Sequence, residues 1–380
     1  MTRRDFIKRF FIATGIAGAT ACGGGIAYLH TPQFGRKPSQ KRLARMLASP
    51  NWKDGAFRNY EPLSAARRVL PNVNRSSRVK VMWNFLFGDK KHLMPSRPLE
   101  VVKTDFSKIS ISEDSAVWLG HSSVFLTLGC YRILIDPVFS PYASPAPFIN
   151  RAFPGEQPCT AADIPHVDLL LVSHDHWDHL DYPTLRAIKD RVGKVATPLG
   201  VGEYLEQWGY AEDAIVEGDW WDVAEPLPGL KLTFLPSRHF SGRLRRPNQT
   251  LWAGFLIECG GKKVLFSGDG GFGRHVYDIA KIAAGCDLAF IENGQYNAKW
   301  PACHMAPPES LEYALAVKAK AVVPVHNCKF VLSEHMWDEP LKRFSTLAYG
   351  RAPLLTPRIG ETLHIPARNG EGCTRWYEEA

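Results

Sequence analysis

The sequence contains no Cys-x-x-Cys pair, and its eight cysteines are scattered from position 22 to position 373. This spacing excludes a short disulfide framework. The sequence also lacks internal repeats, low-complexity tracts and any nucleic-acid-binding module, and its composition indicates neither a disordered chain nor a fibre. With 380 residues it can bury a sizeable core, so we expect one large catalytic domain with smaller appendages.

Acidic residues are scarce in the first part of the chain. Residues 1–110 carry 21 lysines and arginines against 6 aspartates and glutamates, whereas residues 111–380 carry 25 against 32. A basic segment of this kind binds nucleic acid or an anionic membrane surface, or is simply solvated. Because no nucleic-acid module accompanies it, we expect no nucleic-acid partner. An anionic membrane surface remains a candidate partner, and the aromatic run "WNFLFG" is either part of that contact or an edge of the core.

The first thirty residues resemble a twin-arginine export signal. "TRRDFIKRF" places Arg3 and Arg4 in a basic start, and a weakly apolar run rich in Gly and Ala follows over Phe10–Leu29. Residues 1–30 are therefore predicted to be an export signal, with an uncleaved N-terminal anchor as the alternative. Cys22 follows Ala-Thr-Ala and is a candidate lipid-attachment residue. The protein is expected to be periplasmic or anchored at the membrane.

The sequence pattern changes near residue 115. Residues 31–114 predict a basic, irregular extension with one helix over Gln40–Leu47, and residues 115–380 predict the main domain. In that domain "AVWLG", "VFLTLG" and "YRILIDP" indicate a strand meander, after which strands and helices alternate. Strands are predicted at Val167–Val172, Lys231–Leu235, Trp252–Glu258, Lys262–Phe266, Asp287–Ile291 and Ala321–Pro324, and helices at Pro183–Lys189, Val201–Trp208, Arg274–Ala283, Pro308–Val317 and Glu339–Thr346. This order is typical of a layered α/β domain.

The stretch "SHDHWDHLD" directly follows one of these predicted strands. It contains four side chains that bind metals well: His174, His176, Asp178 and His179. On a loop leaving a strand, the first two can converge on one ion while the last two face a second. Mixed imidazole and carboxylate ligands favour zinc, or iron or manganese, over calcium and magnesium. Asp181 and Pro183 are expected to cap the next helix and so to fix the loop.

Four ligands on one loop cannot complete two coordination spheres, so the pattern predicts partners at other strand ends. "KLTFLPSRHFSGR" supplies His239 as a third histidine for the first ion. "KKVLFSGDGGFG" supplies Asp269, an acidic residue able to bridge the ions, and "AVVPVHN" supplies His326 for the second ion. Each alone fits a core or loop residue, but together they reinforce the metal site.

With these motifs, roughly residues 115–346 resemble the metallo-β-lactamase superfamily. "WLGHSSVFLTLGCYRILIDPVFS" and "VDLLLVSHDHWDHLD" are similar to the branch holding N-acyl-phosphatidylethanolamine-hydrolysing phospholipase D and ascorbate-6-phosphate lactonase-like proteins. The resemblance implies an α/β fold, a four-layer αβ/βα sandwich, with two zinc ions at its rim. It assigns His174, His176 and His239 to one ion and Asp178, His179 and His326 to the other, with Asp269 shared. Where relatives often carry His-Trp-Gly, this chain has His326-Asn327-Cys328.

Three further residues are implicated by position in this family pattern. Asp136 in "LIDP" corresponds to a carboxylate beneath the histidine loop. His121 in "GHSS" and His304 in "WPACHMAPPES" correspond to positions near the site. As a catalytic residue, His304 would bind the oxyanion or protonate the leaving group, while Asp178 would steer the nucleophile. Structural roles remain the alternatives, as a buried loop histidine for His304 and as a core histidine for His121.

These features predict a zinc-dependent hydrolase that uses a hydroxide bridging two metal ions. The leading substrate is a phosphodiester, in particular a phospholipid such as N-acyl-phosphatidylethanolamine. A lactonase or amidase with the same metals is the alternative, because such a site cleaves either bond class. A non-enzymatic metal-binding surface protein is the third possibility, which the complete set of seven ligands disfavours.

Overall fold

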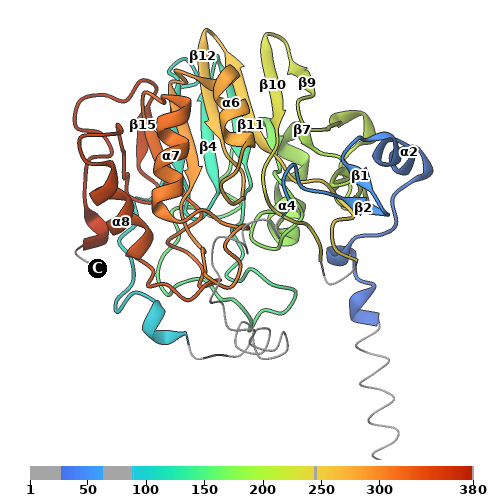
Figure 1. Ribbon diagram of the computed structural model, residues 1–380, viewed down its shortest axis with the longest axis horizontal. Helices are drawn as coiled ribbons and strands as arrows, with labels where there is room; N and C mark the ends of the chain where they lie inside the picture. Colours follow the sequence, from blue (N-terminus) through green and yellow to red (C-terminus); the bar gives the residue numbers. More distant parts are fainter. Residues whose placement is uncertain (1–26, 63–87, 89, 244–245, 379–380) are drawn as a thin grey trace, which may run out of the picture.

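The computed structural model describes residues 27–62, 88, 90–243 and 246–378. Its centre is a pair of β-sheets (Figure 1). The first has the order β15 (Thr362–His364), β3 (Ser115–Trp118), β4 (Val124–Leu128), β5 (Tyr131–Ile135), β6 (Val167–Leu171), β7 (Val192–Pro198) and β8 (Ile215–Gly218). The second has the order β14 (Val322–Val325), β13 (Leu288–Glu292), β12 (Lys262–Phe266), β11 (Gly254–Cys259), β10 (Leu230–Leu235) and β9 (Val223–Leu227).

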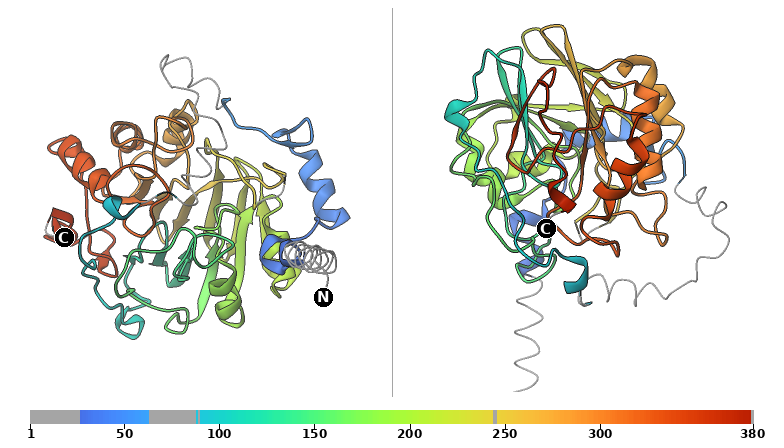
Figure 2. Two further views of the ribbon diagram at one scale, coloured as in Figure 1. Left: turned by 90° about the horizontal axis from the view of Figure 1, so that it is seen from below. Right: turned by 90° about the vertical axis from the view of Figure 1, so that its left-hand side faces the viewer.

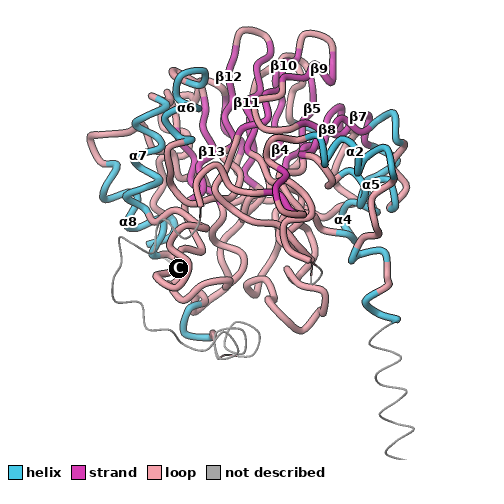
Figure 3. The backbone as a smooth tube through the Cα atoms, turned by 45° about the vertical axis from the view of Figure 1, so that its right-hand side comes forward, coloured by secondary structure: helices cyan, strands magenta, loops and turns pink. Residues whose placement is uncertain are grey.

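Both sheets direct several strands to the same edge of the molecule. Strands β5 to β8 are parallel, and β3 shares their direction because both β3 and β5 are antiparallel to β4. In the second sheet, β10, β12, β13 and β14 likewise share one direction. Loops gather at the lower edge of the sheets, as the tube in Figure 3 shows. The loops that leave these strands therefore come together. The sequence analysis requires this, because it placed the candidate metal ligands after the ends of several strands.

The main core lies between the two sheets. Successive side chains of a strand point to opposite faces, so alternate residues of β6 enter different layers. Leu169 and Leu171 belong to the cluster between the sheets, together with Phe234 and Ile257 of the second sheet. All four side chains are fully buried, which places each sheet's inner face out of water. The two sheets lie face to face in the right-hand view of Figure 2.

Helices cover the outer face of each sheet. On the first sheet, Leu170 of β6 packs in a cluster with Leu185 of α4 (Tyr182–Ile188) and Leu205 of α5 (Gly202–Gln207). On the second sheet, Leu265 packs with Ile279 of α6 (His275–Ala283), and α7 (Pro307–Val317) and α8 (Glu339–Ala348) complete the layer. The layers thus run helix, sheet, sheet, helix. The predicted four-layer αβ/βα sandwich is confirmed.

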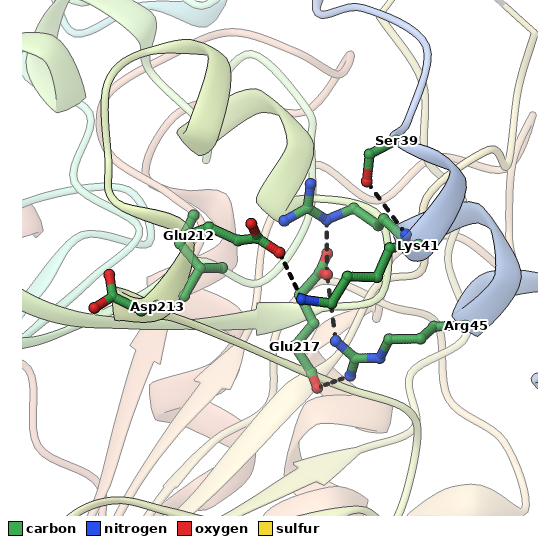
Figure 4. Close-up of a pocket in the computed structure, with 8 residues that line it drawn as sticks. Ser39, Lys41, Arg45, Glu212, Asp213 and Glu217 are labelled. Atoms are coloured by element: carbon green, nitrogen blue, oxygen red, sulfur yellow. Dashed lines mark hydrogen bonds and ion pairs between the residues drawn. The ribbon is translucent and has the colours of Figure 1, made fainter.

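The described part of the N-terminal extension is fixed by buried ion pairs. It holds α2 (Gln40–Ala48) and the short pair β1 (Trp52–Lys53) and β2 (Ala56–Phe57). Arg42, only 6% exposed, donates to Glu217 at 2.8 Å and to Glu203 at 2.7 Å. Around this clamp, Lys41 pairs with Glu212 and Arg45 donates to the Glu217 carbonyl (Figure 4). Breaking a buried pair costs about 3–5 kcal/mol, so α2 is firmly held.

Parts of the N-terminal predictions fall outside the described residues. The export signal with Arg3, Arg4 and Cys22 lies there, as do residues 83–87 of the aromatic run. Among the helices that the structure describes, none is long and apolar enough to cross a membrane.

Sequence analysis did not predict six of the described strands: the two-residue strands β1 and β2, and four strands of the two main sheets, β7, β8, β9 and β15. β7 reads "VGKVATP", whose Gly and Pro are depleted in strands, yet it pairs on both sides with β6 and β8. β8 carries a Glu and ends in Gly, β9 is a largely exposed edge strand, and β15 has three residues. In these cases pairing with neighbouring strands outweighs a weak local pattern.

Candidate metal centre

The histidine loop is held from beneath by Asp136, which follows β5. The Ser173 backbone N–H donates to Asp136 Oδ1 at 2.7 Å, and His179 Nδ1 lies 2.8 Å from Asp136 Oδ2. Because Nδ1 of His179 is engaged in this way, Nε2 is left for the site. All three side chains are fully buried. The carboxylate thus orients both the start of the loop and one of its ligands.

The first group of candidate ligands comprises His174, His176 and His239. Their ligand atoms all lie within 4.8 Å of one another. His239 comes from the loop after β10, and its Nδ1 donates to the Cys303 carbonyl at 2.9 Å. Its Nε2 therefore faces His176, whose Nδ1 lies 3.1 Å away. The structure thus brings together the three histidines that the sequence analysis assigned to one ion.

The second group brings together Asp178, His179 and His326, and it includes His121. Their ligand atoms also lie within 4.8 Å of one another. His326 follows β14, and its Nδ1 lies 3.2 Å from the Ser122 hydroxyl. His121 Nε2 lies 2.8 Å from Asp178 Oδ2, so His121 supports this carboxylate directly.

Asp269, in the turn after β12, lies between the two groups. Its Oδ2 is 3.0 Å from His179 Nε2 and 3.2 Å from His326 Nε2. The same oxygen is 3.9 Å from His239 Nε2 and 4.0 Å from His174 Nε2. One carboxylate oxygen thus faces histidines of both groups, which is the position expected of a bridging ligand.

Several buried polar atoms at the centre of the site do not satisfy one another by hydrogen bonding, and a bound metal ion would satisfy them. His174 Nε2, His179 Nε2 and Asp269 Oδ2 are buried, and none of them forms a hydrogen bond of acceptable geometry among the described residues, although the last two atoms lie 3.0 Å apart. Such orphaned atoms cost free energy unless a ligand satisfies them. Burial also lowers the pKa of His176 to about 4 and that of His174 well below its usual range. Both rings are therefore neutral near pH 7, the form that binds metal.

The carboxylates of the site differ in their electrostatics. Burial raises the pKa of Asp269 to about 6, although His179 beside it acts in the opposite direction. Burial would also raise the pKa of Asp178, but the neighbouring His179 and His121 lower it well below its usual range. Asp178 is therefore ionised throughout the physiological range, and a cation beside Asp269 would favour its ionised form too.

His304 stands beside both groups and is held by a buried glutamate. Its ring stacks on His326 with centroids 5.0 Å apart, and its Nδ1 lies 2.5 Å from Glu292 Oε1. Glu292, at the end of β13, also accepts from the backbone N–H groups of Gly270 and Met305. Burial raises the pKa of Glu292 and lowers that of His304, so neutral forms are favoured. Nε2 of His304 is free of this contact, and His304 also offers a ring nitrogen within 4.8 Å of ligand atoms of His239 and Asp269.

Several site residues adopt left-handed backbone conformations, which non-glycine residues seldom do. The φ angles are 53° at His121, 42° at Asp136 and 66° at His326. His121 and His326 belong to neighbouring backbone segments, because the His326 N–H donates to the His121 carbonyl at 2.9 Å. Backbone strain of this kind concentrates at functional sites, where the surrounding structure holds it.

Asp181 and Pro183 lie at the N-cap and in the first turn of α4, as predicted, and the Asp181 side chain also fixes the loop. This side chain accepts no hydrogen bond from the backbone of that helix. It accepts instead from the Ser140 N–H at 3.0 Å and from the hydroxyls of Ser140 and Thr184. The residue therefore ties the histidine loop to the segment after β5.

Sequence reasoning missed Glu292 and Arg243. Glu292 is the last residue of the buried run "LAFIE". Asp269 was identified because it follows the end of a predicted strand, and the same criterion would have identified Glu292. Arg243 lies in the basic stretch "GRLRRP", which reads as a solvated segment. Its burial follows only from tertiary packing.

Comparisons with known proteins agree with this fold. A family model described as the beta-lactamase superfamily domain matches residues 131–327. An uncharacterized protein of Mycobacterium tuberculosis is 34% identical over 304 residues, covering 79% of this chain and 80% of that protein. A mitochondrial N-acyl-phosphatidylethanolamine-hydrolyzing phospholipase D of Saccharomyces cerevisiae is 30% identical, over 66% of this chain and 54% of that protein. The crystal structure of an isothiocyanate hydrolase from Delia radicum gut bacteria has a TM-score of 0.54 at 18% identity, covering 67% of this chain and 100% of that chain, which shows a shared fold.

Proposed function

This chain belongs to the metallo-β-lactamase superfamily. We propose that it is a two-zinc phosphodiesterase whose substrate is a phospholipid of the N-acyl-phosphatidylethanolamine type. The observation that carries the proposal is the convergence of three orphaned buried atoms, His174 Nε2, His179 Nε2 and Asp269 Oδ2. The seven proposed ligands are His174, His176, Asp178, His179, His239, Asp269 and His326. Their mixture of imidazole and carboxylate suits zinc, with iron or manganese as alternatives.

When bound, two such ions lower the pKa of a shared water toward neutrality and stabilise negative charge on the substrate. The protein's own groups orient the reaction around them. His121 holds Asp178 at 2.8 Å, so this carboxylate is fixed both as a ligand and as an acceptor for the proton of the attacking water. Asp136 holds His179 in one orientation at 2.8 Å. These contacts reduce the reorganisation needed during the reaction.

His304 is proposed to act on the substrate itself. In the arrangement that keeps both groups neutral, Glu292 would donate to His304 Nδ1, 2.5 Å away, and His304 Nε2 would carry the ring's proton. Nε2 can then donate a hydrogen bond to a developing oxyanion. Alternatively it gives its proton to the leaving oxygen while the Glu292 proton passes to Nδ1, which leaves a neutral imidazole and the Glu292 carboxylate. The His304 side chain is 13% exposed, so it keeps some contact with solvent.

The phospholipid substrate is supported by the named activity of the yeast relative, of which this chain covers 54%. A lactone or amide would use the same ligand set, so the bond class has to be tested directly. We expect the purified protein to cleave vesicle-borne N-acyl-phosphatidylethanolamine and a bis-aryl phosphodiester, and to leave a simple lactone intact, in parallel assays by mass spectrometry and absorbance. Cleavage of the lactone with no phosphodiester hydrolysis would overturn the proposed bond class.

We further propose that residues 1–30 export the protein in a folded, metal-loaded form. The export receptor reads the arginine pair itself, and a lysine pair keeps the charge without being recognised. Replacing Arg3 and Arg4 with lysine should therefore leave the protein in the cytoplasm, with the melting temperature of the unchanged protein. Cell fractionation with immunoblotting measures this distribution. Undiminished export of the double variant would indicate a different kind of N-terminal segment.

A further inference from the structure

A buried arginine lies beneath the histidine loop and has no carboxylate partner among the described residues. Arg243 is 1% exposed, and its guanidinium donates to backbone carbonyls. Nε donates to the Asp175 carbonyl at 2.6 Å, and Nη2 donates to the carbonyls of His176 and Leu180. Burying such a charge is costly, so the carbonyls that replace water must be held in place. The donors join Asp175 to Leu180 across the loop.

The loop closes around this side chain. The Trp177 ring lies over the guanidinium, 4.2 Å from the ring centroid to Cζ. The Asp175 side chain accepts from the Gly242 N–H at 2.7 Å and from the Tyr204 hydroxyl at 3.1 Å. Arg243 thus contacts Asp175, His176, Trp177 and Leu180, which are interleaved with the loop's candidate ligands. A planar group with five donors suits this task better than a lysine ammonium.

The N-terminal segment Pro32–Gly35 covers the far side of the arginine. The Gln33 carbonyl accepts from Arg243 Nη1 at 2.9 Å. Phe34 packs edge-on against Trp177, with ring centroids 5.3 Å apart. At Gly35, with φ of 74°, a Cβ atom would lie 2.3 Å from the Tyr204 ring, so the close approach requires glycine. The segment therefore shields the guanidinium from water and completes its set of acceptors.

We propose that Arg243, covered by Pro32–Gly35, is a positioning residue that holds the histidine loop in its metal-binding geometry. The proposal rests on the proposed metal site, because its effect passes through His174, His176, Asp178 and His179. Without the guanidinium, the inward carbonyls lose their donors and the loop loses the contact that joins its two ends. The metal ions should then bind less tightly although every ligand is still present.

The test compares Arg243→Met and Arg243→Lys with a matched pair at Arg191. Arg191 also donates to backbone carbonyls, including those of Ala161 and Ala162, but at the opposite end of β6. Loss of a group that orients a ligand typically weakens metal binding by about 10–100-fold. We expect Arg243→Met to show this loss in chelator competition, and Arg243→Lys a smaller one. Arg191→Met should lower the melting temperature without changing the metal dissociation constant.

Two readouts separate positioning from general destabilisation. The absorption spectrum of the cobalt-substituted protein should change for Arg243→Met and stay unchanged for Arg191→Met. In metal-free protein, the amides of residues 173–181 should exchange hydrogen about tenfold or more faster in the Arg243 variant, which tests the loop even if the wild-type protein holds no metal. If Arg243→Met does not fold, Phe34→Ala provides the same comparison by uncovering the guanidinium. Unchanged affinity, spectrum and exchange, or an equal loss in Arg191→Met, would overturn the proposal.

Discussion

Replacing Asp269 with alanine is expected to release both metal ions and to abolish hydrolysis. Its Oδ2 lies 3.0 Å from His179 Nε2 and 3.2 Å from His326 Nε2, and it also faces the first histidine group. Removing it would therefore take a ligand from both ions and one of the carboxylates that face the site's histidines. The loss in metal affinity should exceed the ~10–100-fold that loss of an outer hydrogen-bond partner causes. Metal-to-protein ratios and kcat/KM measure the effect.

The matched control is Asp287→Ala. Asp287 is also a buried carboxylate, and it accepts from Lys263 N–H at 2.9 Å and Lys320 Nζ at 2.9 Å, away from the metal centre. This variant should lose about 1–3 kcal/mol of stability while keeping both ions. His174→Ala and His239→Ala should empty chiefly one position, since both face the first ion. Full metal content and full rate in Asp269→Ala would exclude a bridging role.

Replacing His304 with asparagine is expected to lower kcat by roughly 10²–10⁴ while leaving metal content and stability close to those of the wild-type protein. The asparagine amide can occupy the place of Nδ1, where it keeps a hydrogen bond to Glu292, whereas nothing replaces Nε2. His304→Ala removes both groups, so it should add a stability loss of about 1–3 kcal/mol to the same loss of rate. Steady-state kinetics and thermal unfolding separate the two effects.

A distant histidine gives the control for this substitution. His364 Nδ1 lies 2.6 Å from Glu371 Oε1, in a pair similar to that of His304 and Glu292. His364→Asn should leave kcat unchanged. A substrate with a better leaving group should restore much of the rate of His304→Asn if Nε2 protonates the leaving oxygen, and an equal loss on both substrates would favour oxyanion binding. A normal rate in His304→Asn would show that His304 has no part in the reaction.

The positions of the candidate ligands could be predicted because they depend on a simple topological rule. His239, Asp269 and His326 each follow a buried apolar run within a few residues, and strands of one direction end at one edge of a sheet. The histidine loop itself is contiguous in sequence, so its ligands had to lie near one another. Local pattern and overall topology agree at these positions.

Other parts of the site depend on contacts between distant segments, which one sequence does not reveal. The cover of Arg243 by Gln33 joins residues 210 positions apart. His121 meets Asp178 across 57 positions, so its contact with the ligand group follows from the adjacency of the two loops. β7 was missed for the same reason, because its stability comes from pairing on both sides. The roles proposed for these residues depend on which distant segments pack against them in the folded protein.

The metal content of the purified wild-type protein tests the central claim most directly. Protein prepared without chelator should contain about two equivalents of zinc, iron or manganese per chain by elemental analysis. Removal of these ions should abolish hydrolysis, and their return should restore it. Protein that contains no metal and hydrolyses its substrate equally well with and without added ions would contradict the account.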